Sequence, residues 1–240
     1  MAERDTSPVV AAISPQDAPS QTDGSGTTIT VANWNIRNGR NGGLEGALRA
    51  VKALGVDFGL LTETKLTGGI YTRNSSGYEV LATDAVNAHQ GGVAICWRKS
   101  ADFEVEETRA WGPNVMTSQL VTGRNRFYVV GGYIPPSDLT TLAQIQNAWD
   151  QCPKGCIPLF LGDLNINLES PRDERDEQIA EECDFRDLED MSRNFLQPRR
   201  RRARGRWSWR MRRGDRWVSS QPDYVLARAR DRHLFRNVGL

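Results

Sequence analysis

The chain is dominated by short apolar runs of strand length, and this pattern limits it to folds built on β-sheet. Each run is rich in β-branched or aromatic residues and is bounded by Gly, Asn or Pro, which is typical of strands joined by turns. In chain order the runs are "TTITVANWNIR", "VDFGLLTETKL", "GYEVLAT", "GGVAICWR", "FEVEETRA", "VMTSQLVTG", "RFYVVGGYIPP" and "CIPLFLGDLNI". From "GYEVLAT" to "RFYVVGGYIPP" no helix intervenes, so we expect an antiparallel meander built onto the first strands.

Helical segments interrupt the strands at three places. Residues 44–54 and 139–149 both carry apolar side chains at helical spacing, and Gly55 closes the first segment. The acidic segment 170–195 begins with a Ser-Pro cap and is also predicted to be helical. A strand, helix, strand unit followed by a meander predicts a single α+β domain.

Residues 1–26 are rich in Ser, Thr, Pro, Asp and Gly and show no periodicity, so we expect a disordered leader before a domain at 27–240. No apolar h-region opens the chain, and no segment approaches the roughly 18 apolar residues of a membrane span. The prediction is an intracellular protein that is not secreted and has no transmembrane segment. No obligate protein partner is evident.

The four cysteines are too few and too irregularly spaced for a disulfide framework. The segment "CPKGC" could suggest zinc, but no His or second Cys pair stands near it to complete four ligands. Thiols in a loop or in the core are the simpler interpretation.

Charge is strongly segregated although the formal net charge is only +1. Residues 199–217 hold ten Arg and one Asp, whereas residues 169–190 hold eleven acidic and three basic side chains. A concentrated basic segment attracts polyanions even when the whole chain is near neutral. We therefore predict DNA as the partner, and with it a nuclear location.

The Arg-rich segment "RRRRARGRWSWRMRRGDRW" is predicted to form a hairpin. Trp207, Trp209 and Met211 alternate with polar residues, as expected if they face inward on a strand, with "RGDR" as the turn. The alternating polar residues and the preceding Arg run would then contact DNA phosphates. The predicted DNA-binding residues are Arg199, Arg200, Arg201, Arg202, Arg206, Ser208, Arg210 and Arg212. The alternative is that these arginines pair with the acidic segment as a solvated charge network.

Polar side chains stand at the tips of several apolar runs. They are Asn35, Glu63, Asp163 and Asn165, and Asp223 stands at the start of a further strand. Strand tips gather at one edge of a sheet, and the period of two sends Asp163 and Asn165 to the same face. Carboxylate and amide oxygens suit Mg²⁺, with Mn²⁺ as a possible substitute, and a carboxylate can orient a water that attacks phosphorus. Taken alone, each residue could be an ordinary turn or loop residue, so the argument rests on the set.

The combination "NWNIR", "LLTETKL", "GGVAICWR", "VVGGYIPP", "PLFLGDLNIN" and "SSQPDYVLA" resembles the endonuclease/exonuclease/phosphatase superfamily of apurinic endonucleases and deoxyribonuclease I. More narrowly, the chain resembles the apurinic-type endonuclease domain of non-LTR retrotransposons, in which a "RWSWR" hairpin before "QPDY" is familiar. The resemblance covers roughly residues 29–240. It implies a deoxyribonuclease I-like, four-layered α/β sandwich of two packed mixed sheets flanked by helices, with the site at one end.

The resemblance also implies roles for individual residues. Asn35 would position metal and phosphate, and Glu63 would be the principal Mg²⁺ ligand. Tyr133 would contact the scissile phosphate, Asp163 would orient or activate the attacking water, and Asn165 would stabilise the transition state. Ser208 occupies a position at which these endonucleases usually carry Thr or Ser near a phosphate.

The sequence departs from the family pattern at two places. Arg37 stands where apurinic endonucleases have an acidic residue. In the family, Asp223 would orient the His of a terminal Ser-Asp-His motif. Leu240 precedes the place where that motif is expected, and the spacing from Asp223 to His233 is too short for His233 to be that His. We therefore expect the last strand to be absent, with a sheet edge left unpaired. His89 is expected to be a loop residue.

Three functions remain open on the sequence. The first is a Mg²⁺-dependent DNA-nicking endonuclease that leaves a 3′ hydroxyl, with catalysis at risk from the missing Asp-His. The second is a phosphatase or phosphodiesterase of the same superfamily that acts on phosphoinositides or sphingomyelin, against which the Arg- and Trp-rich hairpin argues. The third is an inactive DNA-binding remnant.

Overall fold

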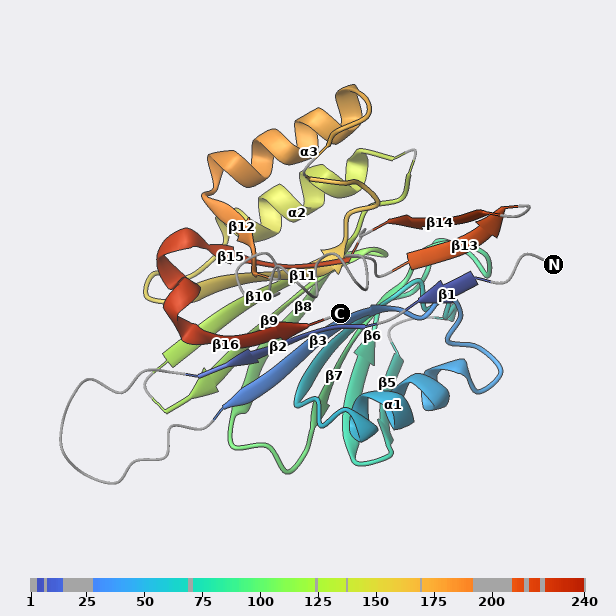
Figure 1. The fold of residues 1–240 in the computed structure, drawn as a ribbon. Helices are drawn as coiled ribbons and strands as arrows, with labels where there is room; N and C mark the ends of the chain where they lie inside the picture. The colour runs from blue at the N-terminus through green and yellow to red at the C-terminus, as the bar shows by residue number, and fades with distance from the viewer. Residues whose placement is uncertain are drawn as a thin grey trace.

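The computed structural model describes residues 4–6, 8–14, 28–68, 71–123, 125–136, 138–168, 170–191, 209–213, 216–220 and 223–239. Within this part of the chain, one sheet has seven strands in the order β16-β2-β3-β4-β7-β6-β5 (Figure 1). Its strands are β2 (Val9–Ile13), β3 (Ile29–Asn35), β4 (Phe58–Thr62), β5 (Tyr71–Ser75), β6 (Tyr78–Ala82), β7 (Val93–Arg98) and β16 (Phe235–Gly239). Only β3 and β4 run parallel.

A second sheet has six strands in the order β12-β15-β11-β10-β9-β8. They are β8 (Glu104–Gly112), β9 (Val115–Thr122), β10 (Asn125–Tyr133), β11 (Ile157–Asp163), β12 (Leu188–Asp190) and β15 (Asp223–Arg228). Strands β10 and β11 are parallel and the other pairs are antiparallel. A small third sheet pairs β1 (Arg4–Thr6) with the hairpin of β13 (Trp209–Arg213) and β14 (Arg216–Ser220).

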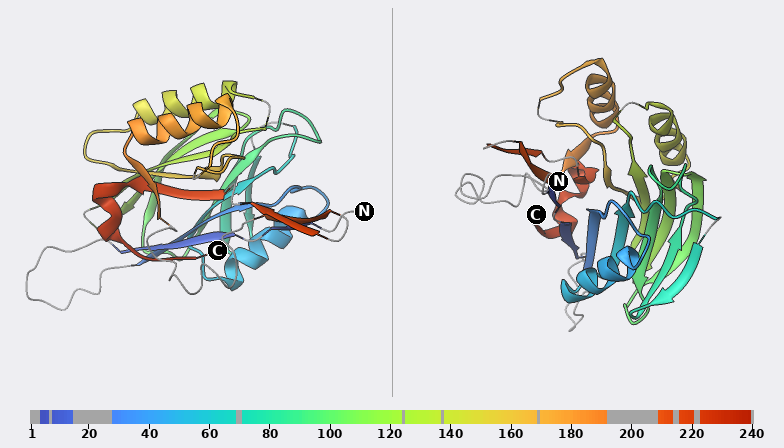
Figure 2. Two further views of the ribbon diagram at one scale, coloured as in Figure 1. Left: turned by 45° about the horizontal axis from the view of Figure 1, so that its top comes forward. Right: turned by 90° about the vertical axis from the view of Figure 1, so that its right-hand side faces the viewer.

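The two large sheets pack face to face, and helices cover their outer faces (Figure 2). The core between the sheets includes Leu60, Met116 and Leu161. Helix α1 (Gly43–Ala53) covers the seven-stranded sheet, while α2 (Thr140–Asp150) and α3 (Glu174–Phe185) cover the six-stranded sheet. The predicted four-layered sandwich of two mixed sheets flanked by helices is confirmed.

Close contact between the layers depends on glycine at the centre of the fold. A Cβ on Gly131 of β10 would lie 2.4 Å from Leu60 Cδ1 of β4 in the facing sheet. A Cβ on Gly162 of β11 would lie 2.3 Å from the Gly132 carbonyl oxygen of its neighbour β10. At both glycines the neighbouring atoms lie too close for a Cβ to fit. The "GG" and "GD" dipeptides in the sequence therefore mark where strands and sheets approach most closely.

The predicted meander is divided between the two sheets. Strands β6 and β7 pair with each other in the seven-stranded sheet, and β8, β9 and β10 pair in the six-stranded sheet. The chain crosses from one sheet to the other after Arg98, where β7 ends. Antiparallel pairing was predicted correctly, but the expectation of one continuous meander was wrong, because local turns do not specify which sheet a strand joins.

The expectation of a disordered leader over residues 1–26 was wrong for Val9–Ile13. These residues form β2, whose burial alternates, with Val9, Ala11 and Ile13 in the core between the sheets. Strand β2 pairs antiparallel with β3 on one side and β16 on the other (Figure 1). Both edges of β3 are therefore paired, with β2 on one side and β4 on the other.

No helix in the described residues is long and apolar enough to cross a membrane.

Candidate active site

Five of the predicted site residues lie where strands of the two sheets end. Asn35 ends β3, Glu63 directly follows β4, Tyr133 ends β10, and Asp163 ends β11 opposite Asp223, the first residue of β15. Within the sheets, Asn35 lies beside Thr62 and Tyr133 beside Asp163. Because β3 packs against β11 and β15 across the two sheets, these strand ends meet at one end of the sandwich.

Asn35 links the two sheets at this end by bonding two carboxylates. Its Nδ2 donates to Glu63 Oε1 at 2.8 Å and to Asp163 Oδ2 at 2.7 Å. Its Oδ1 accepts from the backbone N–H of Arg37 at 3.0 Å, which orients the amide. One neutral side chain therefore holds two acidic groups from different sheets close together.

Asp163 is 1% exposed, so ionising it is unfavourable. Burial raises the pKa of this carboxyl to about 7, and the negative charge of Glu63 acts in the same direction. Hydrogen bonds from Asn35 and from the backbone N–H of Asn165, and the positive charge of Arg175, oppose that rise in pKa. An acid whose pKa lies near neutrality can exchange a proton with a water at physiological pH.

Tyr133 and Asn165 line the same site. Burial, followed by the charges of Glu63 and Asp163, raises the pKa of the Tyr133 phenol, so its hydroxyl stays protonated and can donate. Asn165 Nδ2 donates to the Ile134 carbonyl at 3.0 Å, which leaves the amide's second N–H outside that bond. Both groups suit a partner that accepts hydrogen bonds, such as a phosphate oxygen.

Asp223 lies in the interior beside the site and bonds a residue that sequence reasoning missed. Asn33 Nδ2 donates to Asp223 Oδ1 at 3.0 Å, and both side chains are almost fully buried. Asn33 stands two residues before Asn35, so the strand period places both side chains on the same face of β3. That spacing was the signal by which Asn33 could have been found.

We call Asn35, Glu63, Tyr133, Asp163 and Asn165 the polar cluster. Backbone strain is concentrated around it. Arg37, Glu63, Lys65 and Asn165 all have positive φ, between 53° and 61°, although none is glycine. Such conformations cost about 1 kcal/mol or more each and persist where the surrounding structure enforces them, often at functional sites. Lys65 was also missed by sequence reasoning. Its Nζ lies 3.1 Å from Glu63 Oε2 and brings a positive charge to the site.

The donor chemistry fits Mg²⁺. The described residues contain no group of three or more His, Cys, Asp or Glu side chains that could hold a metal by themselves. Mg²⁺ is commonly held by one or two carboxylates, with waters and substrate phosphate completing its shell. Glu63 and Asp163, which the Asn35 amide N–H groups hold close together, provide such a partial set.

Neither histidine lies in the polar cluster. His233 belongs to the 3-10 helix η1 (Ala229–Leu234), which follows the end of β15 distal to Asp223, and its Nδ1 contacts the Arg230 carbonyl at 2.8 Å. Strand β15 has six residues and spans about 20 Å, so His233 is remote from the site. His89 is exposed in the loop between β6 and β7, as expected.

The predicted DNA-binding residues Arg199–Arg202, Arg206 and Ser208 lie outside the described residues. Arg210 and Arg212 belong to β13, which forms the predicted antiparallel hairpin with β14, with Arg213 opposite Arg216. The backbone of β1 pairs with β13, with Asp5 opposite Arg210. Segments from the two ends of the chain thus meet in one small sheet beside the body (Figure 1).

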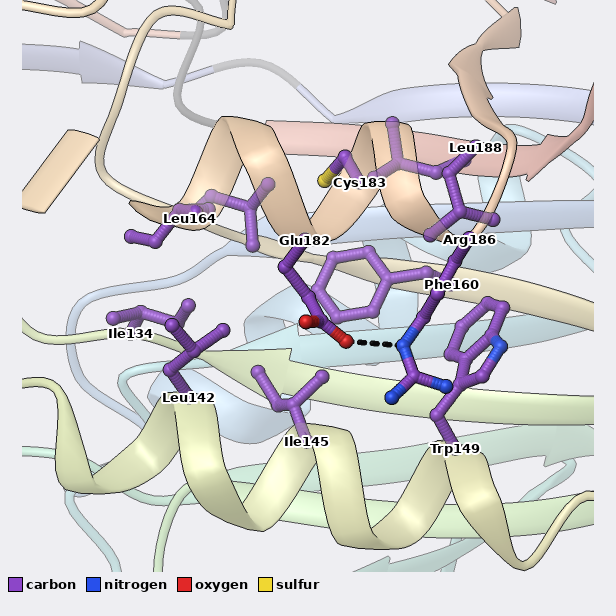
Figure 3. A pocket seen from close by; sticks show the side chains of 12 residues that line it. Ile134, Leu142, Ile145, Trp149, Phe160, Leu164, Glu182, Cys183, Arg186 and Leu188 are labelled. Atoms are coloured by element: carbon purple, nitrogen blue, oxygen red, sulfur yellow. Dashed lines mark hydrogen bonds and ion pairs between the residues drawn. The ribbon is translucent and has the colours of Figure 1, made fainter. Parts of the chain in front are cut away.

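A small cavity lies on the outer face of the six-stranded sheet, between α2 and α3 (Figure 3). Its volume is about 30 Å³, and most of its lining is apolar, including Leu142, Ile145 and Trp149. A cavity this small and apolar is a packing void rather than a ligand site. The polar cluster, on the other face of that sheet, is the candidate active site.

Comparison with known proteins places the chain in a family. Residues 32–238 match the model of the endonuclease/exonuclease/phosphatase family. A search of curated proteins finds no match. The endonuclease domain of TRAS1, a telomere-specific non-LTR retrotransposon, is a similar solved structure, with a TM-score of 0.61 and 16% identity over 83% of this chain and 85% of that domain.

Two further solved structures share the fold. The AP endonuclease LMAP from Leishmania major has a TM-score of 0.59 and 17% identity over 91% of this chain and 85% of its own. D. rerio TDP2, complexed with single-strand DNA product, has a TM-score of 0.53 and 13% identity over 83% of both chains. The family match extends over most of the sequence, and the chain therefore belongs to the endonuclease/exonuclease/phosphatase family, a family of phosphodiester hydrolases.

Proposed function

We propose that this protein is a Mg²⁺-dependent endonuclease that nicks DNA by hydrolysing a phosphodiester bond. The observation that carries the proposal is the bridge made by Asn35, which holds Glu63 and Asp163 at the meeting point of the two sheets. Similarity in fold to a retrotransposon endonuclease domain and an AP endonuclease supports DNA as the substrate. The Arg-rich segment supplies the charge that a DNA ligand requires.

The residues divide the work by their chemistry. Glu63 would hold Mg²⁺, with its carboxylate positioned by the Asn35 amide N–H, and the ion when bound neutralises charge that develops on the phosphoryl group. Asp163 accepts a proton from the attacking water and orients it. Tyr133 and Asn165 donate hydrogen bonds to phosphate oxygens and stabilise the transition state.

The test is nicking of supercoiled plasmid in Mg²⁺ by the full chain, beside EDTA and the variants Asp163→Ala and Glu63→Gln. We expect nicking that EDTA abolishes and that each variant lowers about 100-fold or more, because each removes a group needed in the transition state. Asp163→Ala nicking at the wild-type rate would contradict the assignment.

One observation favours a second function, a DNA-binding protein without turnover. Among the described residues, His89 and His233 both lie outside the polar cluster, so no imidazole is seen to assist there. Plasmid binding that is sensitive to salt, with no nicking under any divalent cation, would establish this second function. Hydrolysis of phosphoinositides or sphingomyelin in place of DNA would contradict both.

A further inference from the structure

The first turn of α3 contains a buried ion pair that faces the candidate site. Asp176 is fully buried, and its Oδ1 lies 3.1 Å from Arg175 Nη1. Its Oδ2 accepts from Arg172 Nε at 2.9 Å, and Asp173 caps the helix by accepting from the Asp176 backbone N–H at 2.9 Å. A buried carboxylate with two arginine partners fixes the direction of both guanidinium groups.

Arg175 reaches from this helix to two loops of the site. We define the Tyr133 loop as residues 133–135 and the Asp163 loop as residues 163–165. Arg175 Nη2 donates to the Pro135 carbonyl at 3.0 Å and to the Leu164 carbonyl at 3.3 Å. Arg172 adds a bond from Nη2 to the Asn165 carbonyl at 3.2 Å. The guanidinium of Arg175 therefore bridges the backbones of both loops.

The loops are also bonded directly to each other. The Ile134 backbone N–H donates to the Asp163 carbonyl at 2.9 Å, and Asn165 Nδ2 donates to the Ile134 carbonyl at 3.0 Å. Asn165 has a φ of 53°, a conformation that needs support from its surroundings. The bridge from Arg175 supplies support from outside the two loops.

Net stability alone gives little reason for this arrangement. Replacing a buried ion pair with apolar residues that pack well is often neutral or stabilising, because taking two charges out of water costs free energy. Arginine is also specific here, since its planar fork can bond two carbonyls and a carboxylate at once, whereas a lysine ammonium presents a single point of charge. The geometry indicates that the Arg175–Asp176 pair fixes the position of the two loops rather than adding net stability.

We propose that Arg175, oriented by Asp176, is a positioning residue that locks the Tyr133 loop and the Asp163 loop into one arrangement. The effect on catalysis rests on the function proposed above. Tyr133, Asp163 and Asn165 then meet the scissile phosphate in fixed positions without Arg175 itself contacting it. Misplacing catalytic groups by about 1 Å can lower a rate about 100-fold.

The experiment compares Arg175→Met, Arg175→Lys and Arg186→Met. Arg186 is the matched control because it lies at the C-terminal end of α3, with its side chain 14% exposed against 13% for Arg175. It pairs with Asp150 at 2.9 Å and with Glu182, and these bonds go to neither loop. Figure 3 shows the pairing with Glu182. Melting temperature, kcat and KM for nicking of a duplex are measured for each variant.

We expect Arg175→Met to lower kcat about 10- to 100-fold with little change in KM. Arg175→Lys should recover the melting temperature but not kcat, because it keeps the charge and loses the bridge. Arg186→Met should lower the melting temperature about as much as Arg175→Met and leave kcat unchanged. Wild-type kcat in Arg175→Met, full rescue by Lys, or an equal loss of kcat in Arg186→Met would overturn the proposal.

Amide hydrogen exchange tests the positioning role without any activity. The Ile134 and Asn165 amides both bond within the two loops, so they should exchange faster in Arg175→Met and at the wild-type rate in Arg186→Met. If the wild-type chain does not nick DNA, the proposed function fails, and exchange alone decides the positioning role. Unchanged exchange at both amides in Arg175→Met would overturn that role.

Discussion

At the scale of single residues, the site is governed by how two acidic groups are held together. Glu63 and Asp163 come from different sheets, and their mutual repulsion is offset by the two N–H groups of Asn35. Burial penalises the charged form of Asp163 further, so the cluster stores unfavourable electrostatic energy when no cation is bound. A divalent cation or a substrate-bound cation would relieve this energy, which ties stability to ligand binding.

Asn35→Ala removes the shared donor and leaves two carboxylate oxygens without their partner. We expect unfolding free energy to fall by about 1–3 kcal/mol, since buried polar groups lose hydrogen bonds. Asn38→Ala is the matched control, because Asn38 is exposed and its side chain bonds the nearby Arg40 N–H in the same loop. Urea denaturation in EDTA measures the unfolding free energy of both variants. Equal values would contradict the role of Asn35 as a bridge between the two carboxylates.

Asp163 makes stability depend on pH in the absence of metal. Because its folded pKa is raised from 3.8 to about 7, the folded state binds the proton more tightly than the unfolded state does. Its favourable contribution is complete below pH 3.8 and is lost as pH rises through 7. Relative to Asp163→Asn, the wild type should lose up to about 4 kcal/mol between these limits, at about 1.4 kcal/mol per pKa unit. The unfolding free energy of both proteins is measured in EDTA as a function of pH. Parallel curves for the wild type and Asp163→Asn would exclude this effect.

At the scale of elements, the position of β2 has the largest consequence. This strand fills the gap between β3 and β16 and contributes to the core shared by both sheets. It begins at Val9 opposite Asn33, so the chain preceding it lies at the end of the sheet where the site is built. Segment 4–6 then pairs with β13 and connects the Arg-rich hairpin to the body.

The burial alternation of β2 predicts opposite outcomes for two neighbouring substitutions. Ala11 is fully buried between the sheets, so Ala11→Glu should destabilise the protein by about 3 kcal/mol or more. Ala12 points to the other face and is half-buried, so Ala12→Glu should cost much less. Thermal unfolding by circular dichroism measures the difference. Equal and negligible effects would mean that these residues do not form a strand.

The Arg-rich segment predicts a steep salt dependence of DNA binding. Changing Arg199, Arg200, Arg201 and Arg202 to Ala should weaken binding at low salt. The slope of log K against log salt should fall by about 3 to 4, because each phosphate that a cation neutralises contributes about 0.9 to it. Fluorescence anisotropy over a salt series measures this slope. An unchanged slope would favour the alternative in which these arginines pair with the acidic segment.

At the scale of the whole molecule, the two sheets share one core, and residues from both ends of the chain build it. Val9 and Phe235 belong to the same apolar cluster as Leu60, Val129 and Leu161. The sandwich therefore closes only when the N-terminal strand and the C-terminal strands are in place together. Folding and the geometry of the site depend on this closure, since the site lies where the two sheets meet.

Removing residues 1–26 should abolish cooperative folding. The shortened chain loses three buried side chains of β2, worth about 1.5–3 kcal/mol each for the two larger ones, and it exposes the edge of β3. That loss approaches the total stability of a typical domain. A chain lacking only residues 1–3 is the control. A cooperative melt of the chain 27–240 at the control's temperature would contradict this role for β2.

Local pattern was sufficient to predict most elements and the fold class. The apolar runs ending at Asn35, Thr62, Tyr133 and Asp163 all became buried strands, and 44–54 and 139–149 became α1 and α2 within a residue or two. The meeting of the polar strand tips also followed from the sequence, because strand ends gather at an edge. The run "VVAAI" was passed over because only five residues separate Pro8 from Ser14, too few to stand out from the polar residues around them.

The sequence by itself determined which segments are strands and helices, which residue types stand at their ends, and where positive charge is concentrated. Only the tertiary structure decided that β2 lies between β3 and β16, that the meander divides between two sheets, and that Asn35 and Arg175 bridge separate elements. The physical reason is that periodicity reflects whether a residue is buried, which is a local property. The identity of the residue that buries it depends on long-range packing, which no short stretch of sequence contains.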